Sequence, residues 1–195
     1  MAVFADHVRE MNERIIELSR SYAILWVFID PGNCKRYSKV IRDHQDFFDA
    51  IASSLFQGFC VITYLLFDSK RSDVKSLPSL INYLSSLNPT LERQLKFNID
   101  AQRPLLDKYF SFRHKIYAHR DKAKSPWELF GKVPKARVKR EMQAIVRLSR
   151  NTVCALDGAS GVRKKAELAQ EIRRRENYAR WDAMEVLKAL EKHTL

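Results

Sequence analysis

Apolar side chains recur at alternating steps of four and three residues from Phe4 to Ile29. The series consists of Phe4, Val8, Met11, Ile15, Leu18, Tyr22, Leu25 and Ile29. This spacing places all of them on one face of a helix and is typical of a helix that packs in a bundle. The segment Asp30-Pro31-Gly32-Asn33 follows. It ends the helix, because proline lacks an amide donor and glycine permits a reversal.

A second helix is predicted from about Asp43 to Phe67, antiparallel to the first. Its apolar stripe consists of Phe47, Ile51, Leu55, Phe59, Ile62 and Leu66. No charged residue lies between Asp49 and Asp68, a length close to the minimum for crossing a bilayer. The stretch contains several polar residues and lacks a flanking basic cluster. We therefore expect a central helix covered on most sides by its neighbours, and no membrane contact.

The rest of the chain predicts a polar loop from Asp68 to Ser76 and then further helices. Asn88-Pro89 and Ser125-Pro126-Trp127-Glu128 each begin a short helix, because Asn and Ser cap helices and proline suits the first turn. Longer helices are expected over about 100–119, 135–156 and 162–190. With only 5 Gly and 6 Pro, the predicted fold class is all-α, an antiparallel helical bundle.

Asp157-Gly158-Ala159-Ser160-Gly161 is the clearest predicted hinge in the chain. It divides a helical bundle over residues 1–157 from a C-terminal helical extension over residues 158–195. The final helix either packs on its own bundle as part of the same domain or forms an arm that reaches a partner.

The charge of the chain is unevenly distributed. The formal net charge is +12, yet residues 1–112 hold 14 Lys and Arg against 13 Asp and Glu. Residues 113–150 hold 12 against 3. A basic region of this kind attracts a polyanion, with nucleic acid as the first candidate and an acidic membrane surface as the second. A solvated basic face without a partner is the alternative.

Several kinds of site are excluded. Cys34, Cys60 and Cys154 form no CxxC pair, so neither a zinc ribbon nor a thioredoxin-type site is expected. The chain contains no GxGxxG, P-loop, HExxH or GxSxG motif. We therefore expect no metal and no cofactor. Free thiols and an N-terminus without an apolar signal sequence favour a cytoplasmic location.

The remaining chemistry lies at the end of one predicted helix, in Arg113, His114, Tyr117 and His119. Imidazole exchanges a proton near neutral pH, and a guanidinium binds phosphate through paired hydrogen bonds. These groups suit metal-free RNA cleavage, in which a base activates a ribose 2′-hydroxyl and the arginine stabilises the charged phosphate. The nearby cations Lys115, Arg120 and Lys122 are candidates for contacts with the RNA backbone.

Helix geometry limits this site. Arg113 and Tyr117 are four residues apart and share a face, whereas His119 lies roughly 120° around the axis from Arg113. Either the helix unwinds near His119, or two copies of the segment meet in a symmetric homodimer.

The stretch RHKIYAHRDK, Arg113 to Lys122, resembles the HEPN superfamily, and its wording is similar to abortive-infection AbiU-type members. Arg113 and His119 fit the family's Arg-x(4–6)-His signature, with a polar residue, His114, directly after the arginine. The resemblance implies a helical bundle that dimerises through this region. It also implies a metal-independent ribonuclease of a toxin–antitoxin, anti-phage or RNA-processing system, with an antitoxin protein as a possible partner.

Besides a partner-binding or antitoxin-neutralised scaffold in which the last helix makes the interface, two other interpretations stay open. In the first, a non-catalytic helical dimer binds RNA, a nucleotide or a protein partner through the basic region. In the second, Arg113 merely pairs with an acid such as Asp121, and His119 ends a helix.

Overall fold

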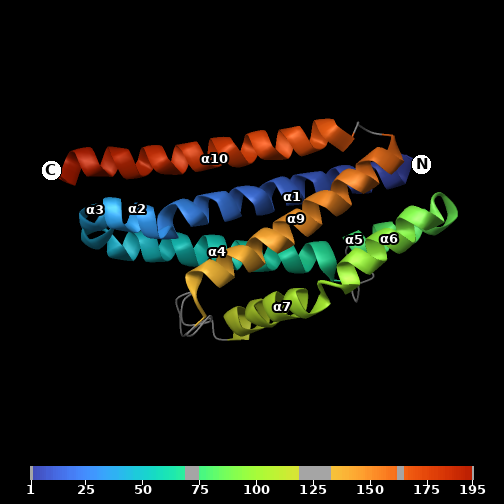
Figure 1. Cartoon of the computed structure of the whole chain (residues 1–195), viewed down its shortest axis with the longest axis horizontal. Helices are drawn as coiled ribbons and strands as arrows, with labels where there is room; N and C mark the ends of the chain where they lie inside the picture. Colours follow the sequence, from blue (N-terminus) through green and yellow to red (C-terminus); the bar gives the residue numbers. More distant parts are fainter. Residues whose placement is uncertain (1, 69–74, 119–132, 162–164, 195) are drawn as a thin grey trace.

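The computed structural model describes residues 2–68, 75–118, 133–161 and 165–194, and every regular element among them is a helix (Figure 1). The five long helices are α1 (Ala2–Ile29), α4 (Gln45–Phe67), α7 (Arg103–Ala118), α9 (Lys135–Ser160) and α10 (Lys165–Thr194). The short elements are α2 (Pro31–Arg36), α3 (Ser38–Asp43), α5 (Leu77–Tyr83), the 3-10 helix η1 (Leu84–Ser86) and α6 (Pro89–Asp100). The all-α prediction is confirmed.

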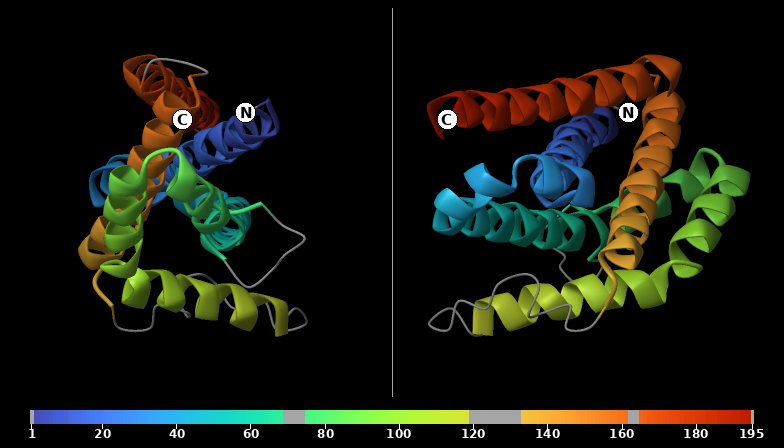
Figure 2. Two further views of the ribbon diagram at one scale, coloured as in Figure 1. Left: turned by 90° about the vertical axis from the view of Figure 1, so that its right-hand side faces the viewer. Right: turned by 60° about the vertical axis from the view of Figure 1, so that its left-hand side comes forward.

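Helix α1 is the centre of the bundle. It lies between α10 and α4 and is crossed by α9, and it contacts all three (Figures 1 and 2). All eight members of the predicted apolar stripe are buried, with exposed fractions from 0% to 6%. Helix α4 runs antiparallel to α1, as its sequence predicts. The period of four and three therefore located both the helix and its buried face.

The predicted face of α4 is wrong by one residue over its first half. Phe47 is 50% exposed, whereas its neighbour Phe48 is 4% exposed. Ala52 and Phe56 are buried in place of Ile51 and Leu55, which are only partly covered. Because this helix is apolar on nearly every side, hydrophobic spacing cannot select the side that faces the core.

Helix α4 is also less covered than expected. It is the one helix in the described part of the chain that is long and apolar enough to cross a membrane, and 44% of its most apolar window is buried. That buried face packs against α1 and α7, which is the packing of a core helix.

Proline starts helices in this chain where a loop or a continuing helix was expected. Pro31 begins α2, because Asp30 caps it by accepting a hydrogen bond from the Gly32 amide at 3.0 Å. Pro104 lies in the first turn of α7, which starts at Arg103 instead of about Asp100. The predicted cap at Asn88 is confirmed by a 3.0 Å hydrogen bond from the Leu91 amide. The capping box at 125–128 lies outside the described residues.

The predicted hinge begins too early. Helix α9 continues through Asp157 to Ser160, and only Gly161 turns the chain, with a left-handed φ of 71°. Asp157 is fully buried and accepts a hydrogen bond from Asn12 Nδ2 on α1 at 3.0 Å. After the turn, α10 packs along α1 of the same chain and buries Leu168, Ile172, Ala179, Ala183 and Leu187.

The buried Asn12–Asp157 contact generates a stability prediction. We expect Asp157→Ala to lower the free energy of unfolding by about 1–3 kcal/mol, because the Asn12 amide then stays buried without its acceptor. Asp157→Asn retains an acceptor oxygen and serves as the control, with a smaller loss. Urea denaturation followed by circular dichroism measures both, and equal stability of Asp157→Ala and the wild type would contradict the prediction.

Candidate functional site

Helix α7 carries the first part of the motif and is held on the bundle by aromatic packing. It lies along the edge of the molecule opposite α10 (Figures 1 and 2). Tyr109 and Phe112 are buried against Phe56 of α4, with ring centroids 6.3 and 6.0 Å away. Tyr109 also meets Phe59 edge-on at 5.7 Å. These contacts fix the rotation of α7 about its axis, and thereby the direction of the residues that follow.

Arg113 stacks on an aromatic ring. Its guanidinium carbon lies 4.3 Å from the ring centroid of Tyr64 on α4, within the range of a cation–π interaction. Phe110, one turn earlier on α7, meets the same Tyr64 ring edge-on at 5.2 Å. A guanidinium that stacks on a ring has its N–H groups in the guanidinium plane and not toward the ring. This geometry suits hydrogen bonds from its edges to a phosphate. The half-buried Arg113 is thus positioned by a neighbouring helix.

His114 belongs to the same group of side chains. It is exposed, and its ring packs edge-on against Tyr64 at a centroid distance of 5.9 Å. Its Nδ1 lies 3.4 Å from an Arg113 guanidinium nitrogen. This contact is a hydrogen bond when Nδ1 carries no proton. One tyrosine therefore contacts both the arginine and the polar residue that follows it.

The structure places only part of the predicted site. Arg113, His114 and the exposed Lys115 are described, and Tyr117 lies in the last turn of α7, with its side chain outside the description. His119, Arg120 and Lys122 lie outside the described residues. The structure therefore joins the arginine and His114, and the relation of His119 to them stays a prediction.

Tyr64 is a site residue that the sequence analysis missed. It lies in the uncharged stretch of α4 and looks like any other apolar core position. Its signal in the sequence is weak, because a tyrosine in an apolar helix usually serves packing alone. Only the approach of α7 to α4 brings its ring under Arg113.

Helix α9 holds α7 from its other side. Lys108 of α7 forms an ion pair with Glu141 of α9 at 2.5 Å, and Arg137 adds a second contact to Glu141 at 3.1 Å. Glu141 is one of three acids among residues 113–150. Its role here is to bind α7 to α9.

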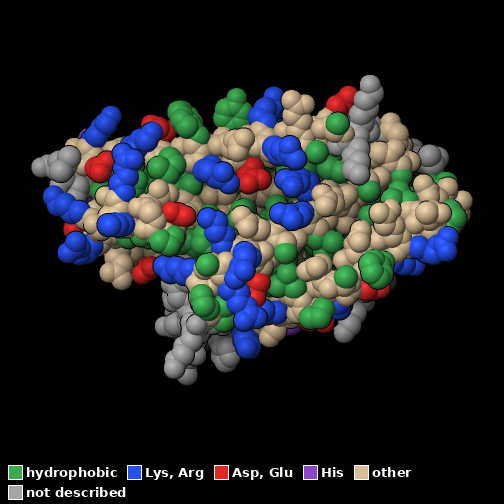
Figure 3. Space-filling model, in the orientation of Figure 1, with side chains coloured by type: hydrophobic (Ala, Val, Ile, Leu, Met, Phe, Trp, Pro, Cys, Tyr) green, Lys and Arg blue, Asp and Glu red, His purple; other side chains and the backbone are tan. Residues whose placement is uncertain are grey.

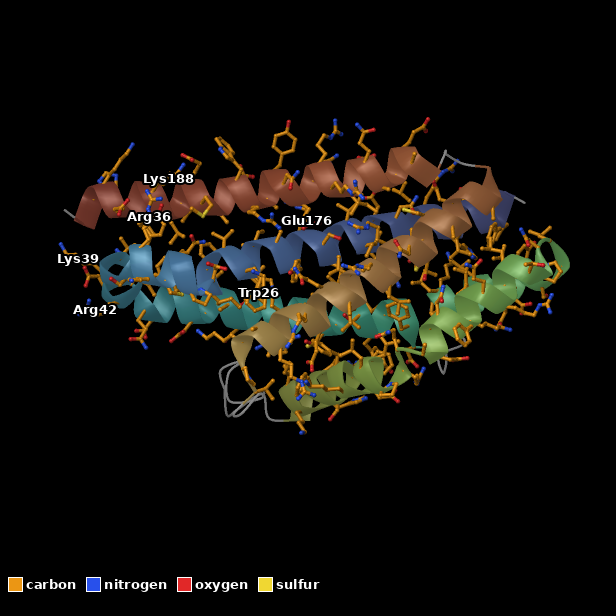
Figure 4. The ribbon with its side chains drawn as sticks, in the orientation of Figure 1. Trp26, Arg36, Lys39, Arg42, Glu176 and Lys188 are labelled. Atoms are coloured by element: carbon orange, nitrogen blue, oxygen red, sulfur yellow. The ribbon has the colours of Figure 1, made fainter. Side chains whose placement is uncertain are left out.

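The basic surface extends beyond the predicted region. Basic side chains are spread over the face formed by α9, α10 and the α2–α3 end (Figure 3). Residues 31–42 contain Lys35, Arg36, Lys39 and Arg42 and no acid. Arg36, Lys39 and Arg42 lie with Lys188 of α10 at one end of the bundle (Figure 4). The charge balance over residues 1–112 did not reveal this cluster, because Asp and Glu residues elsewhere in that segment offset its positive charge.

No group of three His, Cys, Asp or Glu side chains in the described ranges could hold a metal ion. Of the three cysteines, Cys60 and Cys154 are buried and Cys34 is half-buried, and none forms a disulfide. Burial raises the pKa of the Cys60 thiol well above its usual value, which keeps it protonated and unreactive.

Comparison with known proteins assigns a family to most of the chain. The family model HEPN_AbiU2, with the description AbiU2, matches residues 1–141. No curated protein and no solved structure matches the chain. The matched range includes α1 to α7 and the first turns of α9, and it leaves out most of α9 and all of α10.

The stacking of Arg113 on Tyr64 can be measured by a double-mutant cycle. We expect Tyr64→Leu and Arg113→Ala to couple by about 0.5–1 kcal/mol in the free energy of unfolding, because either change removes the cation–π contact. Tyr64→Phe retains the ring and is expected to retain most of the coupling. Urea denaturation of the wild type, the two single variants and the double variant supplies the four free energies of unfolding. Additive effects in the Leu cycle would show that the contact contributes nothing.

Proposed function

This chain belongs to the AbiU2 family of HEPN proteins, and we propose that it is a metal-independent endoribonuclease of a toxin or anti-phage defence system. The family match supports the general class. The observation that supports the activity is the group formed by Arg113, His114 and Tyr64, which presents a fixed guanidinium beside an exposed imidazole. This group lies where the basic region of the sequence begins.

The proposed reaction is transfer of a phosphate ester to the neighbouring ribose 2′-oxygen. His119 removes the 2′-hydroxyl proton, and the oxygen attacks the adjacent phosphorus. The bond from phosphorus to the 5′-oxygen breaks, and that oxygen takes up a proton, which leaves a 2′,3′-cyclic phosphate and a 5′-hydroxyl end. Arg113 binds the phosphate oxygens as their negative charge grows.

The other predicted residues support this reaction. His114 orients the phosphate or the Arg113 side chain, in line with its 3.4 Å approach to the guanidinium. Tyr117 is proposed as an auxiliary group. Lys115, Arg120 and Lys122 are proposed to contact the RNA backbone, where each phosphate contact contributes salt-dependent affinity.

We propose that two protomers contribute to each site. Arg113 lies on the regular helix α7, and a continuation of that helix would carry His119 to a different side of its axis. A symmetric dimer brings two copies of the segment together, so that the arginine of one protomer can serve the histidine of the other.

Alanine substitution tests the assignment of the residues. We expect Arg113→Ala and His119→Ala each to lower the rate of RNA cleavage in EDTA by roughly 10²–10⁴-fold, because each removes a transition-state interaction. Arg93→Ala removes an exposed arginine from α6 and is the matched control, with unchanged cleavage. Full activity of either site variant would overturn the proposal. Salt-sensitive binding without cleavage by the wild type would favour the non-catalytic alternative.

Mixing the two inactive variants tests the composite dimer site. After co-refolding, about half of the dimers contain one chain of each variant, and one of their two sites has an intact Arg113 and His119 from different chains. We expect cleavage to recover to about a quarter of the wild-type rate. A site formed within one chain gives no recovery, since no chain in the mixture holds both residues.

A further inference from the structure

A polar pocket lies between α1, α9 and α10. It has a volume of about 320 Å³, at the small end of the range for ligand sites. Its walls come from α1, the start of α2, α9 and α10. Trp26 marks its α1 side, and Glu176 lies on the adjoining part of α10 (Figure 4). Arg180 and Met184 of α10 complete this pocket, and α10 lies outside the matched family range.

One wall holds a buried donor without an acceptor. Trp26 is 5% exposed and lines the pocket, and its indole Nε1 has no hydrogen-bond partner among the described residues. A buried N–H group without a partner is uncommon, since the loss of its water is then uncompensated. The indole therefore indicates that an acceptor belongs beside it.

Two cations line the pocket from different helices. Lys139 of α9 lies 5.3 Å from the Trp26 ring centroid and 3.5 Å from a carboxylate oxygen of Asp30. Arg180 of α10 lies 3.2 Å from Glu176. Both cations are about half exposed, so these ion pairs are weak and can exchange for a better anion.

Hydrogen bonds and ion pairs within the chain already use part of the polar lining of the pocket. Asp30 caps α2 through its other carboxylate oxygen, and the Asn33 amide donates to the Val27 carbonyl at 2.9 Å. Burial raises the pKa of Tyr22 to about 12, although a hydrogen bond with Gln143 lowers it, so the phenol is neutral at physiological pH. The side chains of Trp26, Lys139 and Arg180 can only donate, so the lining offers more donors than acceptors.

We propose that this pocket binds a small organic phosphate. Donors from α1, α9 and α10 reach it from three directions, which suits a tetrahedral anion better than a planar carboxylate. Lys139 and Arg180 would bind the phosphate oxygens, and Trp26 would donate its indole N–H. Val27 and Met184 supply an apolar surface for the rest of the ligand.

Titration calorimetry of the full chain with phenyl phosphate tests the proposal, with benzoate and benzyl alcohol as the carboxylate and neutral probes. We expect phenyl phosphate to bind at least about tenfold more tightly than benzoate, and benzyl alcohol to give no heat of binding. Trp26→Phe keeps an aromatic ring without the N–H and is expected to weaken binding about fivefold.

Two arginine variants on α10 separate specific binding from general charge. Arg180→Ala is expected to weaken binding of phenyl phosphate at least about tenfold, with partial recovery in Arg180→Lys. Arg175→Ala is the matched control, because Arg175 pairs with Glu171 at the same four-residue spacing and lies outside the pocket lining. It is expected to change affinity less than about twofold.

Equal losses in Arg180→Ala and Arg175→Ala, or no binding by the wild type, would overturn the proposal. Arg113→Ala distinguishes this site from the proposed cleavage site. An affinity for phenyl phosphate that falls in Arg113→Ala and not in Arg180→Ala would place the probe on α7 and reject the pocket.

Discussion

Burial of one face of α1 is the interaction on which the rest of this structure depends. The stripe from Phe4 to Ile29 is covered by α4, α9 and α10, which come from the first and last thirds of the chain. Each large apolar side chain that leaves water contributes about 1.5–3 kcal/mol, before the loss of chain entropy offsets it. Helix α1 contacts three of the other four long helices, so its packing sets where they lie.

Helix α9 connects the two proposed sites. On one side, Glu141 pairs with Lys108 and so positions α7. Two residues away, Lys139 faces Trp26 and the pocket that α10 completes. Residues two apart on a helix point in different directions, so α9 serves both sides at once. Its buried Asp157 anchors the far end of the helix to Asn12.

The family match and the geometry support different parts of the functional proposal. The match assigns the chain to the AbiU2 family over residues 1–141 and supports the general class of HEPN defence proteins. The geometry adds a reason for the position of Arg113, since the Tyr64 ring holds the guanidinium beside His114. The proposed phosphate pocket depends on residues beyond the match, Gln143, Arg180 and Met184.

The sequence by itself determined the all-α class, the buried face of α1, the cap at Asn88 and the stretch from Arg113 that resembles HEPN proteins. These follow from local patterns, because helix period and capping depend on residues only a few positions apart. Only the tertiary structure decided which face of α4 is buried, because an apolar helix gives no periodic signal of its own. It also placed Asp157 in a buried contact with Asn12 and Tyr64 beneath Arg113. Both contacts join helices far apart in sequence, and their geometry depends on how those helices pack against each other.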